Sequence, residues 1–197
     1  LVVVKFQKKD IRSLTKEELR RFFLDRGDQA FRGNQVYEWL WNKSLHSFEE
    51  MSNISKATRV MLEKHFVINH IKVDSMQRSA DGTIKNGIHL HDGLIVESVL
   101  IPTDTRTTAC VSSQVGCSLD CKFCATARLK RMRNLNPDEI YDQVVAIDQQ
   151  SRLYHQQRLS NIVFMGMGEP LMNYNNVLKA IDKITSPEGL GMSAKRI

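Results

Sequence analysis

The second half of the chain alternates short β-prone runs with helical patterns, and this alternation restricts the fold. Residues 107–111 are β-prone, and residues 162–165 form an unbroken apolar run typical of a strand buried on both faces. Between them, Asn136 followed by Pro137 marks a helix start, and a second helical pattern spans residues 174–184. Two consecutive strand–helix units imply parallel strands joined by right-handed crossovers. The sequence therefore predicts an α/β fold here.

The α/β pattern breaks off early. The chain ends at Ile197, where a third strand is expected to begin. Two or three parallel strands do not form a complete α/β domain, because such sheets are normally covered on both faces. We therefore expect this chain to be the front part of a longer protein.

The first seventy residues have helical patterns instead. Thr15 and Glu18 have the spacing of a capping box, in which each side chain accepts a hydrogen bond from the other residue's main chain. A second helix is expected from near Asn34, burying one of the two tryptophans, and a third after Ser55. We assign residues 1–72 to a small helical domain.

Three β-prone runs follow, over residues 71–79, 83–91 and 94–101. Asp-Gly pairs separate them, at Gly82 and Gly93, and the sequence predicts two-residue hairpin turns there. The expected structure is an antiparallel meander. The domain boundaries are therefore 73–104 for the meander and 105–197 for the α/β region.

Three of the four cysteines, Cys117, Cys121 and Cys124, form a C-x3-C-x2-C motif. A structural zinc site closes with four ligands, and a Cys-held iron–sulfur cluster usually takes four as well, so three thiolates would leave one iron open to a ligand. The fourth cysteine, Cys110, lies seven residues upstream and could complete a zinc site. The motif favours an iron–sulfur cluster over zinc, and a disulfide is the least favoured reading.

Composition gives weaker guidance. The net charge is +6, which favours an anionic partner such as nucleic acid. No apolar run approaches the ~20 residues of a membrane span, so we expect no membrane partner and a cytoplasmic location. Reducing conditions there would keep clustered cysteines available as ligands.

Three further features are candidates for chemistry. Gly168 and Glu169 follow the second predicted strand, where an open backbone and a carboxylate could hold an ammonium group. Glu97 interrupts an apolar run, and either a partly buried proton acceptor or an outward-facing residue fits it. A basic run after the cysteines is either a solvated surface or a phosphate contact. It comprises Arg128, Lys130, Arg131 and Arg133.

The cysteine triplet after a first strand and the Gly-Glu turn after a second resemble the radical S-adenosylmethionine (SAM) superfamily. The longer segments around Cys110, Cys121 and residues 165–171 resemble its RlmN/Cfr group of ribosomal RNA adenine methyltransferases. The first helical domain also looks like the N-terminal domain of that group. The resemblance implies a partial, truncated radical SAM (β/α) barrel preceded by the helical domain and the meander.

The resemblance also implies site roles. Cys117, Cys121 and Cys124 would ligate a 4Fe-4S cluster whose fourth iron chelates SAM, and Gly168 with Glu169 would bind the methionine end of SAM. The family transfers a methyl group through a methyl-carrying cysteine near the C-terminus. Its counterpart would lie beyond Ile197, so the chain as it stands is not expected to complete methyl transfer.

The remaining two roles also come from the resemblance. Cys110 matches the cysteine that releases the covalent RNA adduct by forming a disulfide with the methyl-carrying one, and Glu97 matches the proton acceptor. The implied substrate is carbon 2 of an adenine in 23S ribosomal RNA, with transfer RNA as a further candidate. An electron donor such as flavodoxin and a monomeric state are also expected.

Three alternatives remain open. The carbon 8 methyltransferase of the same group carries the same motifs. A non-catalytic RNA-binding module with a zinc site made by Cys110 and the triplet is a different class. A radical SAM enzyme that acts on a protein is the third.

Overall fold

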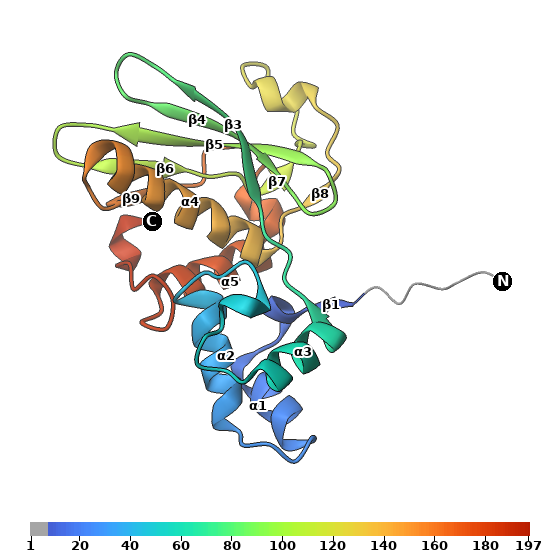
Figure 1. Cartoon of the computed structure of the whole chain (residues 1–197). Helices are drawn as coiled ribbons and strands as arrows, with labels where there is room; N and C mark the ends of the chain where they lie inside the picture. Colours follow the sequence, from blue (N-terminus) through green and yellow to red (C-terminus); the bar gives the residue numbers. More distant parts are fainter. Residues whose placement is uncertain (1–7) are drawn as a thin grey trace. The chain divides into compact units, whose positions relative to one another are not determined.

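The structure is a computed structural model that describes residues 8–197. Residues 1–7, at the start of the predicted helical domain, lie outside the described part. The chain divides into two compact units, the first ending at Asn69 and the second running from His70 to Ile197 (Figure 1). No helix in the described range is long and apolar enough to span a bilayer.

The first unit is helical. Its capping box is confirmed: the Glu18 amide donates to the Thr15 hydroxyl at 3.1 Å, and the Thr15 amide donates to the Glu18 carboxylate at 2.7 Å. A short parallel strand pair, β1 with β2, closes the unit. Its regular elements are β1 (Lys9–Asp10), η1 (Ile11–Ser13), α1 (Lys16–Leu24), α2 (Phe31–Trp41), η2 (Phe48–Glu50), α3 (Lys56–His65) and β2 (Phe66–Val67).

The predicted start of α2 was wrong by three residues. The helix begins at Phe31, after Ala30, which is itself in a helical conformation and makes no side-chain cap. Without a capping side chain the sequence carries no start signal at that point. Trp41 is the buried tryptophan, whereas the indole of Trp39 donates to Asn53 at 2.5 Å.

The second unit is built on a five-stranded sheet with the order β3-β4-β5-β6-β9. The first four strands are antiparallel, and β6 pairs with β9 in parallel, with α4 as the crossover between them. The predicted meander and the parallel pair are both confirmed. The strands of this unit are β3 (Lys72–Arg78), β4 (Ile84–His89), β5 (Ile95–Pro102), β6 (Thr107–Cys110), β7 (Gln114–Val115), β8 (Arg133–Asn134) and β9 (Asn161–Val163). The helices are η3 (Ala125–Arg128), α4 (Pro137–His155), η4 (Pro170–Asn173), α5 (Tyr174–Thr185) and η5 (Ala194–Arg196).

The hairpin turns are one residue longer than predicted. The Ser79 amide donates to the Thr83 carbonyl, and the Leu90 amide donates to the Leu94 carbonyl, so each loop holds three residues. The last loop residue is glycine in the left-handed region, with φ of 85° at Gly82 and 82° at Gly93. This is a type I turn followed by a glycine bulge, which needs the same Asp-Gly pair as a two-residue turn.

The strand predicted over residues 162–165 is shorter than expected. β9 ends at Val163, and Met165 is 79% exposed. The chain leaves the ladder because the Gly166 amide turns to the carbonyl of Val111, the residue that follows β6, at 3.1 Å.

The two faces of the sheet differ in burial. β5 alternates strictly up to Leu100: Val96 and Leu100 are buried, whereas Ile95 and Glu97 are exposed. The buried face packs against α4 and α5, which lie along one side of the sheet in Figure 1. The shared core includes Ile88, Val96, Leu135, Ile140, Val177 and Ala180.

The register between the strands shows which residues lie on the other face of the sheet. Gly87 pairs with Glu97, and Val99 pairs with both Lys85 and Cys110. Paired residues share a face of a sheet, so Lys85, Glu97 and Cys110 all lie on the face opposite to the helices.

Two isoleucines on opposite faces test this arrangement. Ile88→Ala should lower the free energy of unfolding by about 3 kcal/mol, because it leaves a cavity in the core between sheet and helices. Ile95→Ala, on the open face of the neighbouring strand, should cost about 1 kcal/mol or less. Urea unfolding followed by circular dichroism measures both, since the two tryptophans lie in the first unit. Equal losses would contradict the two-faced sheet.

Candidate functional site

The loops that follow β6 and β9 lie against each other. Parallel strands end at the same edge of a sheet, and hydrogen bonds continue the pairing beyond the last ladder residues. The amides of Ser113 and Gln114 donate to the Met167 carbonyl at 2.9 and 3.1 Å. The segment leading to the cysteines and the Gly-Glu turn are thus neighbours, as the strand order predicts.

Ser112 is a buried junction beneath this edge. Its hydroxyl donates to the Glu97 carbonyl at 2.5 Å and accepts from the Met167 amide at 2.8 Å. The side chain of Gln143, on α4, closes a pair with Ser112: the Ser112 amide donates to it at 2.8 Å, and it donates back to the Ser112 carbonyl at 3.2 Å. Three elements of the site region therefore meet at one residue.

The Gly168–Glu169 turn has a constrained backbone. Gly168 has φ of 93°, and a Cβ there would lie 2.5 Å from the Cβ of Gln114. The Glu169 amide donates to the Gln114 side-chain oxygen at 2.9 Å. One oxygen of the Glu169 carboxylate accepts from the Leu171 amide at 3.0 Å, which caps η4. A side chain at position 168 would disrupt this close approach.

The three clustered cysteines lie on the loop between β7 and β8. Cys117, Cys121 and Cys124 are partly exposed, and Phe123 between them is 94% exposed. In the part of the chain that the structure describes, no three His, Cys, Asp or Glu side chains are close enough to hold a metal ion. The three thiols are therefore not gathered into a preformed site.

The chemistry of this loop still suits a thiolate-bound cluster. Main-chain amides of Ala127 and Thr126 donate to the Cys124 sulfur and lower the pKa of that thiol. The Leu119 amide donates to the Cys117 sulfur at 3.4 Å. Amide donors stabilise thiolates, and metal ligands commonly assemble only as the metal binds. Three thiols on one exposed loop, two of them accepting main-chain hydrogen bonds, fit a 4Fe-4S cluster with one open iron.

Cys110 has a different environment. It lies in β6, pairs with Val99 and Val163, and is 8% exposed. Burial raises the pKa of its thiol, although the Met165 amide donates to the sulfur and opposes that rise. All four cysteines are free thiols. Cys110 therefore belongs to the sheet, whereas the three clustered cysteines belong to the loop.

Glu97 faces outward, one of the two readings that the sequence left open. Its carboxylate is half-exposed and lies 2.6 Å from the Lys85 ammonium. The pairing of Val99 with Cys110 makes Glu97 a diagonal neighbour of Cys110 on the open face. The sheet therefore brings together the two residues that the resemblance singled out for proton and thiol chemistry.

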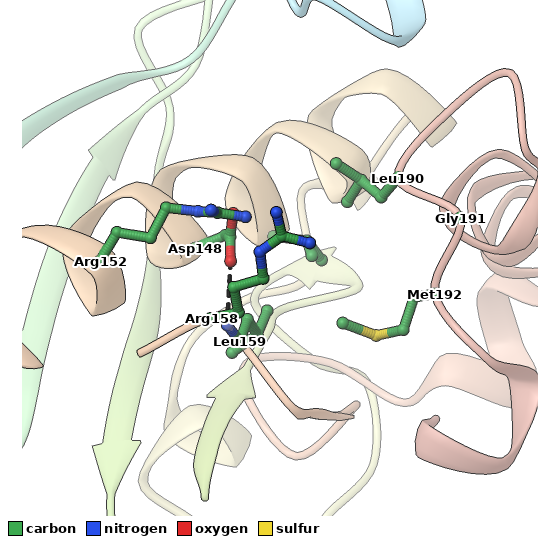
Figure 2. Close-up of a pocket in the computed structure, with 8 residues that line it drawn as sticks. Asp148, Arg152, Arg158, Leu159, Leu190, Gly191 and Met192 are labelled. Carbon is green, nitrogen blue, oxygen red and sulfur yellow. Dashed lines mark hydrogen bonds and ion pairs between the residues drawn. The ribbon is translucent and has the colours of Figure 1, made fainter. Parts of the chain in front are cut away.

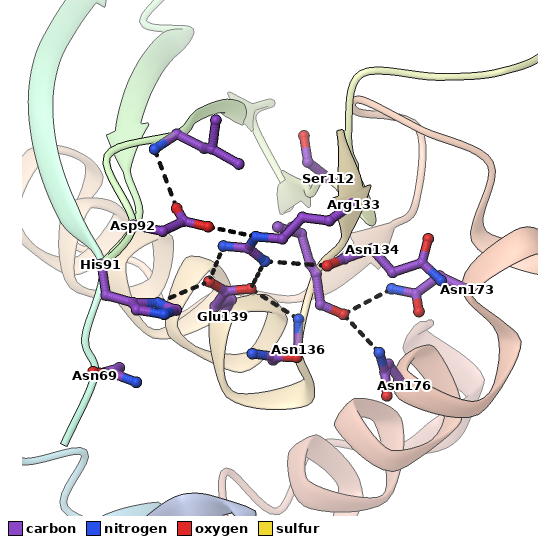
Figure 3. A network of polar contacts seen from close by, with 12 residues as sticks. Asn69, His91, Asp92, Ser112, Arg133, Asn134, Asn136, Glu139, Asn173 and Asn176 are labelled. Atoms are coloured by element: carbon purple, nitrogen blue, oxygen red, sulfur yellow. Dashed lines mark hydrogen bonds and ion pairs between the residues drawn. The ribbon is translucent and has the colours of Figure 1, made fainter. Parts of the chain in front are cut away.

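The basic run after the cysteines divides into two parts. Arg128, Lys130 and Arg131 are exposed, whereas Arg133 turns inward to Glu139 with two contacts of 2.7 Å (Figure 3). Arg133 also lies 2.6 Å from Asp92 in the β4–β5 turn. These contacts raise the pKa of Arg133, with the hydrogen bonds to Glu139 as the largest cause. Arg133 is thus a structural residue at the end of the cysteine loop.

A pocket of about 210 Å³ lies elsewhere, at the start of β9 (Figure 2). Asp148 in this pocket accepts from the Leu159 amide at 2.9 Å and from Arg152 at 2.7 Å. Arg158 and Met192 also line it. Leu159 precedes β9, so the pocket is at the opposite end of that strand from the Gly-Glu turn.

Sequence reasoning missed the polar residues that join the loops. Ser112, Gln114 and Gln143 are completely buried. The first two are short polar interruptions in a β-prone stretch, and the third lies among the apolar positions of α4. A buried polar residue is expected to be hydrogen-bonded, but the sequence carried no signal that they were buried.

Comparison with known proteins matches both units. Residues 9–68 match the family described as the ribosomal RNA large subunit methyltransferase N-terminal domain. Residues 111–193 match the radical SAM superfamily.

Curated relatives match nearly the whole chain. Over 194 residues it is 75% identical to a probable dual-specificity RNA methyltransferase RlmN of Flavobacterium johnsoniae and 77% identical to that of Christiangramia forsetii. The matches cover 98% of this chain and 56% and 55% of those proteins. A dual-specificity RNA methyltransferase RlmN of Geotalea uraniireducens is 42% identical, over 97% of this chain and 54% of that protein. The chain thus spans about half the length of these relatives.

A solved structure has the same fold. The crystal structure of a radical SAM methyltransferase from Sphaerobacter thermophilus superposes with a TM-score of 0.84 at 33% identity. The match covers 96% of this chain and 55% of that one. The chain is therefore a partial radical SAM fold, as the sequence predicted.

The environment of Cys110 predicts slow alkylation. At pH 8 in the absence of iron, iodoacetamide should label Cys110 at least about tenfold more slowly than the loop cysteines, because burial limits access and raises the pKa of its thiol. Timed quenching with peptide mass spectrometry measures each rate. Labelling of Cys110 at the rate of Cys121 would contradict the buried placement.

The Arg133–Glu139 pair predicts a large stability effect. Glu139 is 3% exposed in its side chain, so Glu139→Ala should lower the free energy of unfolding by about 3 kcal/mol by leaving Arg133 without its main partner. Asp120→Ala removes the fully solvated partner of Lys122 and should cost less than about 1 kcal/mol. Urea unfolding measures both variants, and similar small losses would show that the Arg133–Glu139 pair adds little.

Proposed function

The chain belongs to the RlmN group of the radical SAM superfamily, and from that membership we propose that the full-length protein is an RNA methyltransferase acting on adenine. The observation that carries the proposal is the junction at the sheet edge. There, the segment leading to the cysteine triplet is hydrogen-bonded to the Gly168–Glu169 turn through Met167 and Gln114. A cluster on the loop and a cofactor on the turn would therefore be adjacent.

The residues divide between two cofactors. Cys117, Cys121 and Cys124 would hold a 4Fe-4S cluster, and Gly168 with Glu169 would hold the amino-acid end of SAM. When bound, the reduced cluster supplies one electron that cleaves SAM and starts radical chemistry. An external electron donor such as flavodoxin is needed for each turnover.

Two residues of the open sheet face would handle the later steps. Glu97 would take the proton from the adenine carbon that has gained the methyl bridge, and Lys85 at 2.6 Å keeps a positive charge beside that carboxylate. The Cys110 thiolate would then attack the sulfur of the methyl-carrying cysteine. The new disulfide forms as the sulfur–carbon bond to the RNA breaks, and the electron pair stays on the bridging carbon, which takes up a proton to become the methyl group of the base. The attacked cysteine would come from the part of the protein that follows residue 197.

We propose carbon 2 of an adenine in 23S ribosomal RNA as the target, with transfer RNA as a second substrate. The relatives' printed names describe them as dual-specificity RNA methyltransferases, which supports two classes of RNA. The net charge of +6 and the exposed Arg128, Lys130 and Arg131 beside the cysteine loop suit a phosphate backbone. A cytoplasmic monomer is consistent with this role.

Anaerobic reconstitution of the full-length protein tests the function. The reduced protein should convert SAM to 5′-deoxyadenosine and methylate ribosomal RNA, and nucleoside mass spectrometry should find 2-methyladenosine. Finding 8-methyladenosine would assign the carbon 8 activity instead. One tightly bound zinc per chain with no SAM cleavage would refute the proposal, and methylation of a protein alone would replace the substrate class.

Replacing Cys110, the thiol proposed to release the RNA, should trap the covalent adduct. In the full-length protein, Cys110→Ala should accumulate RNA covalently joined to protein, because no thiol is available to release it. A denaturing gel with labelled RNA measures this, and the parent protein should show at least about tenfold less adduct. The double variant Cys110→Ala with Cys121→Ala should show none, since it lacks a cluster ligand. Free methylated RNA from Cys110→Ala at the parent rate would contradict the role.

A further inference from the structure

Gln114 contacts both the Gly168–Glu169 turn and the base of the cysteine loop. It is completely buried in β7, three residues before the first clustered cysteine. Its side-chain oxygen accepts from the Glu169 amide at 2.9 Å, and its side-chain nitrogen donates to the Asn134 side-chain oxygen at 2.7 Å. Its main-chain amide donates to the Met167 carbonyl. One residue thereby contacts both the turn and the cysteine loop's second stem.

Asn134 extends this connection. It pairs with Gln114 across the β7–β8 ladder that closes the base of the cysteine loop. Its side-chain amide donates to the Met172 carbonyl at 3.2 Å, in the η4 turn that Glu169 caps. The Gln114–Asn134 pair therefore joins the base of the loop to both ends of the segment Glu169–Met172.

Gly168 lies so close to Gln114 that position 168 has no room for a side chain. A Cβ at Gly168 would lie 2.5 Å from the Gln114 Cβ and 2.8 Å from its main-chain nitrogen. The turn thus rests directly on Gln114, and the hydrogen bond to the next residue's amide fixes its orientation. The cysteine loop is exposed, whereas the Gln114 side chain is buried. Gln114 therefore fixes the position of the turn relative to the base of the loop.

We propose that Gln114 is a positioning residue for SAM: it holds the Gly168–Glu169 turn in register with the base of the cysteine loop, so that one ligand meets both. The inference rests on the proposed function, because it assigns SAM to this turn. Gln114 acts through the Glu169 main chain and the loop stems.

The experiment uses the full-length protein with Gln114→Met, which keeps the side chain's length and removes both of its hydrogen bonds. Iron per chain should stay close to that of the parent, and the thermal unfolding midpoint should fall no further than in the control variant Gln150→Ala, which also loses a pair of side-chain hydrogen bonds. The dissociation constant for SAM, measured by equilibrium dialysis without reductant, should rise about tenfold for the loss of a buried hydrogen bond. The change that SAM causes in the paramagnetic spectrum of the reduced cluster should be weakened as well.

Gln150→Ala is the matched control. Gln150 makes a similar pair of side-chain hydrogen bonds, with Asn86 at 2.8 and 2.9 Å, but on the helix-covered face of the meander. It should leave SAM binding unchanged. A purely structural role for Gln114 would lower the stability of Gln114→Met without a selective loss of SAM binding.

Three outcomes separate the possibilities. Parent-like SAM affinity and an unaltered SAM-induced spectrum in Gln114→Met would overturn the proposal. Loss of iron in both Gln114→Met and the smaller Gln114→Ala would overturn it too, since Gln114 would then serve only to form the loop. Failure of the parent protein itself to bind SAM would reject the proposed function, which is distinguishable from either result.

Discussion

The parallel pairing of β6 with β9 is the constraint on which the rest of the site depends. Parallel strands need a long crossover, and α4 provides it while covering the buried face of the sheet. The same pairing brings the ends of both strands to one edge. The cysteine loop and the Gly-Glu turn are more than forty residues apart in sequence, and this pairing brings them to the same edge of the sheet.

Beyond the strand ends, hydrogen bonds from side chains replace the main-chain pairing of the sheet. A loop that leaves a sheet still carries main-chain donors and acceptors that need partners when they are buried. The Ser112 hydroxyl bonds the Glu97 carbonyl and the Met167 amide. The Gln114 side chain accepts from the Glu169 amide. The Asn173 side chain donates to the carbonyls of Ser113 and Leu135. These polar residues explain why two connecting segments without regular structure have a defined relation to each other.

Local signals predicted local structure well. The capping box at Thr15, the cap at Asn136 and the Asp-Gly turns all act within a few residues, so the sequence shows both partners of each interaction. The start of α2 was missed because no capping side chain marks it, whereas the end of β9 and the burial of Gln114 were missed because they depend on distant contacts. The outward direction of Glu97 was undecided, because a strand flanked by apolar residues has the same pattern whichever face is covered. The triplet spacing predicted a cluster site, but it did not show where the three thiols lie relative to one another on the loop.

The candidate site therefore combines residues held on paired strands with cysteines on an exposed loop. Glu97 and Cys110 are fixed on adjacent strands, where the ladder sets their separation. The proton transfer and thiol attack proposed for them would depend steeply on geometry and would benefit from such rigid placement. The three clustered cysteines lie on an exposed loop, and iron–sulfur bonds would gather their thiols if the proposed cluster forms there. What that loop cannot supply is a fixed position for the turn beside it. The buried amide of Gln114 supplies it, because it is bonded to the stem of the loop and to the turn at once.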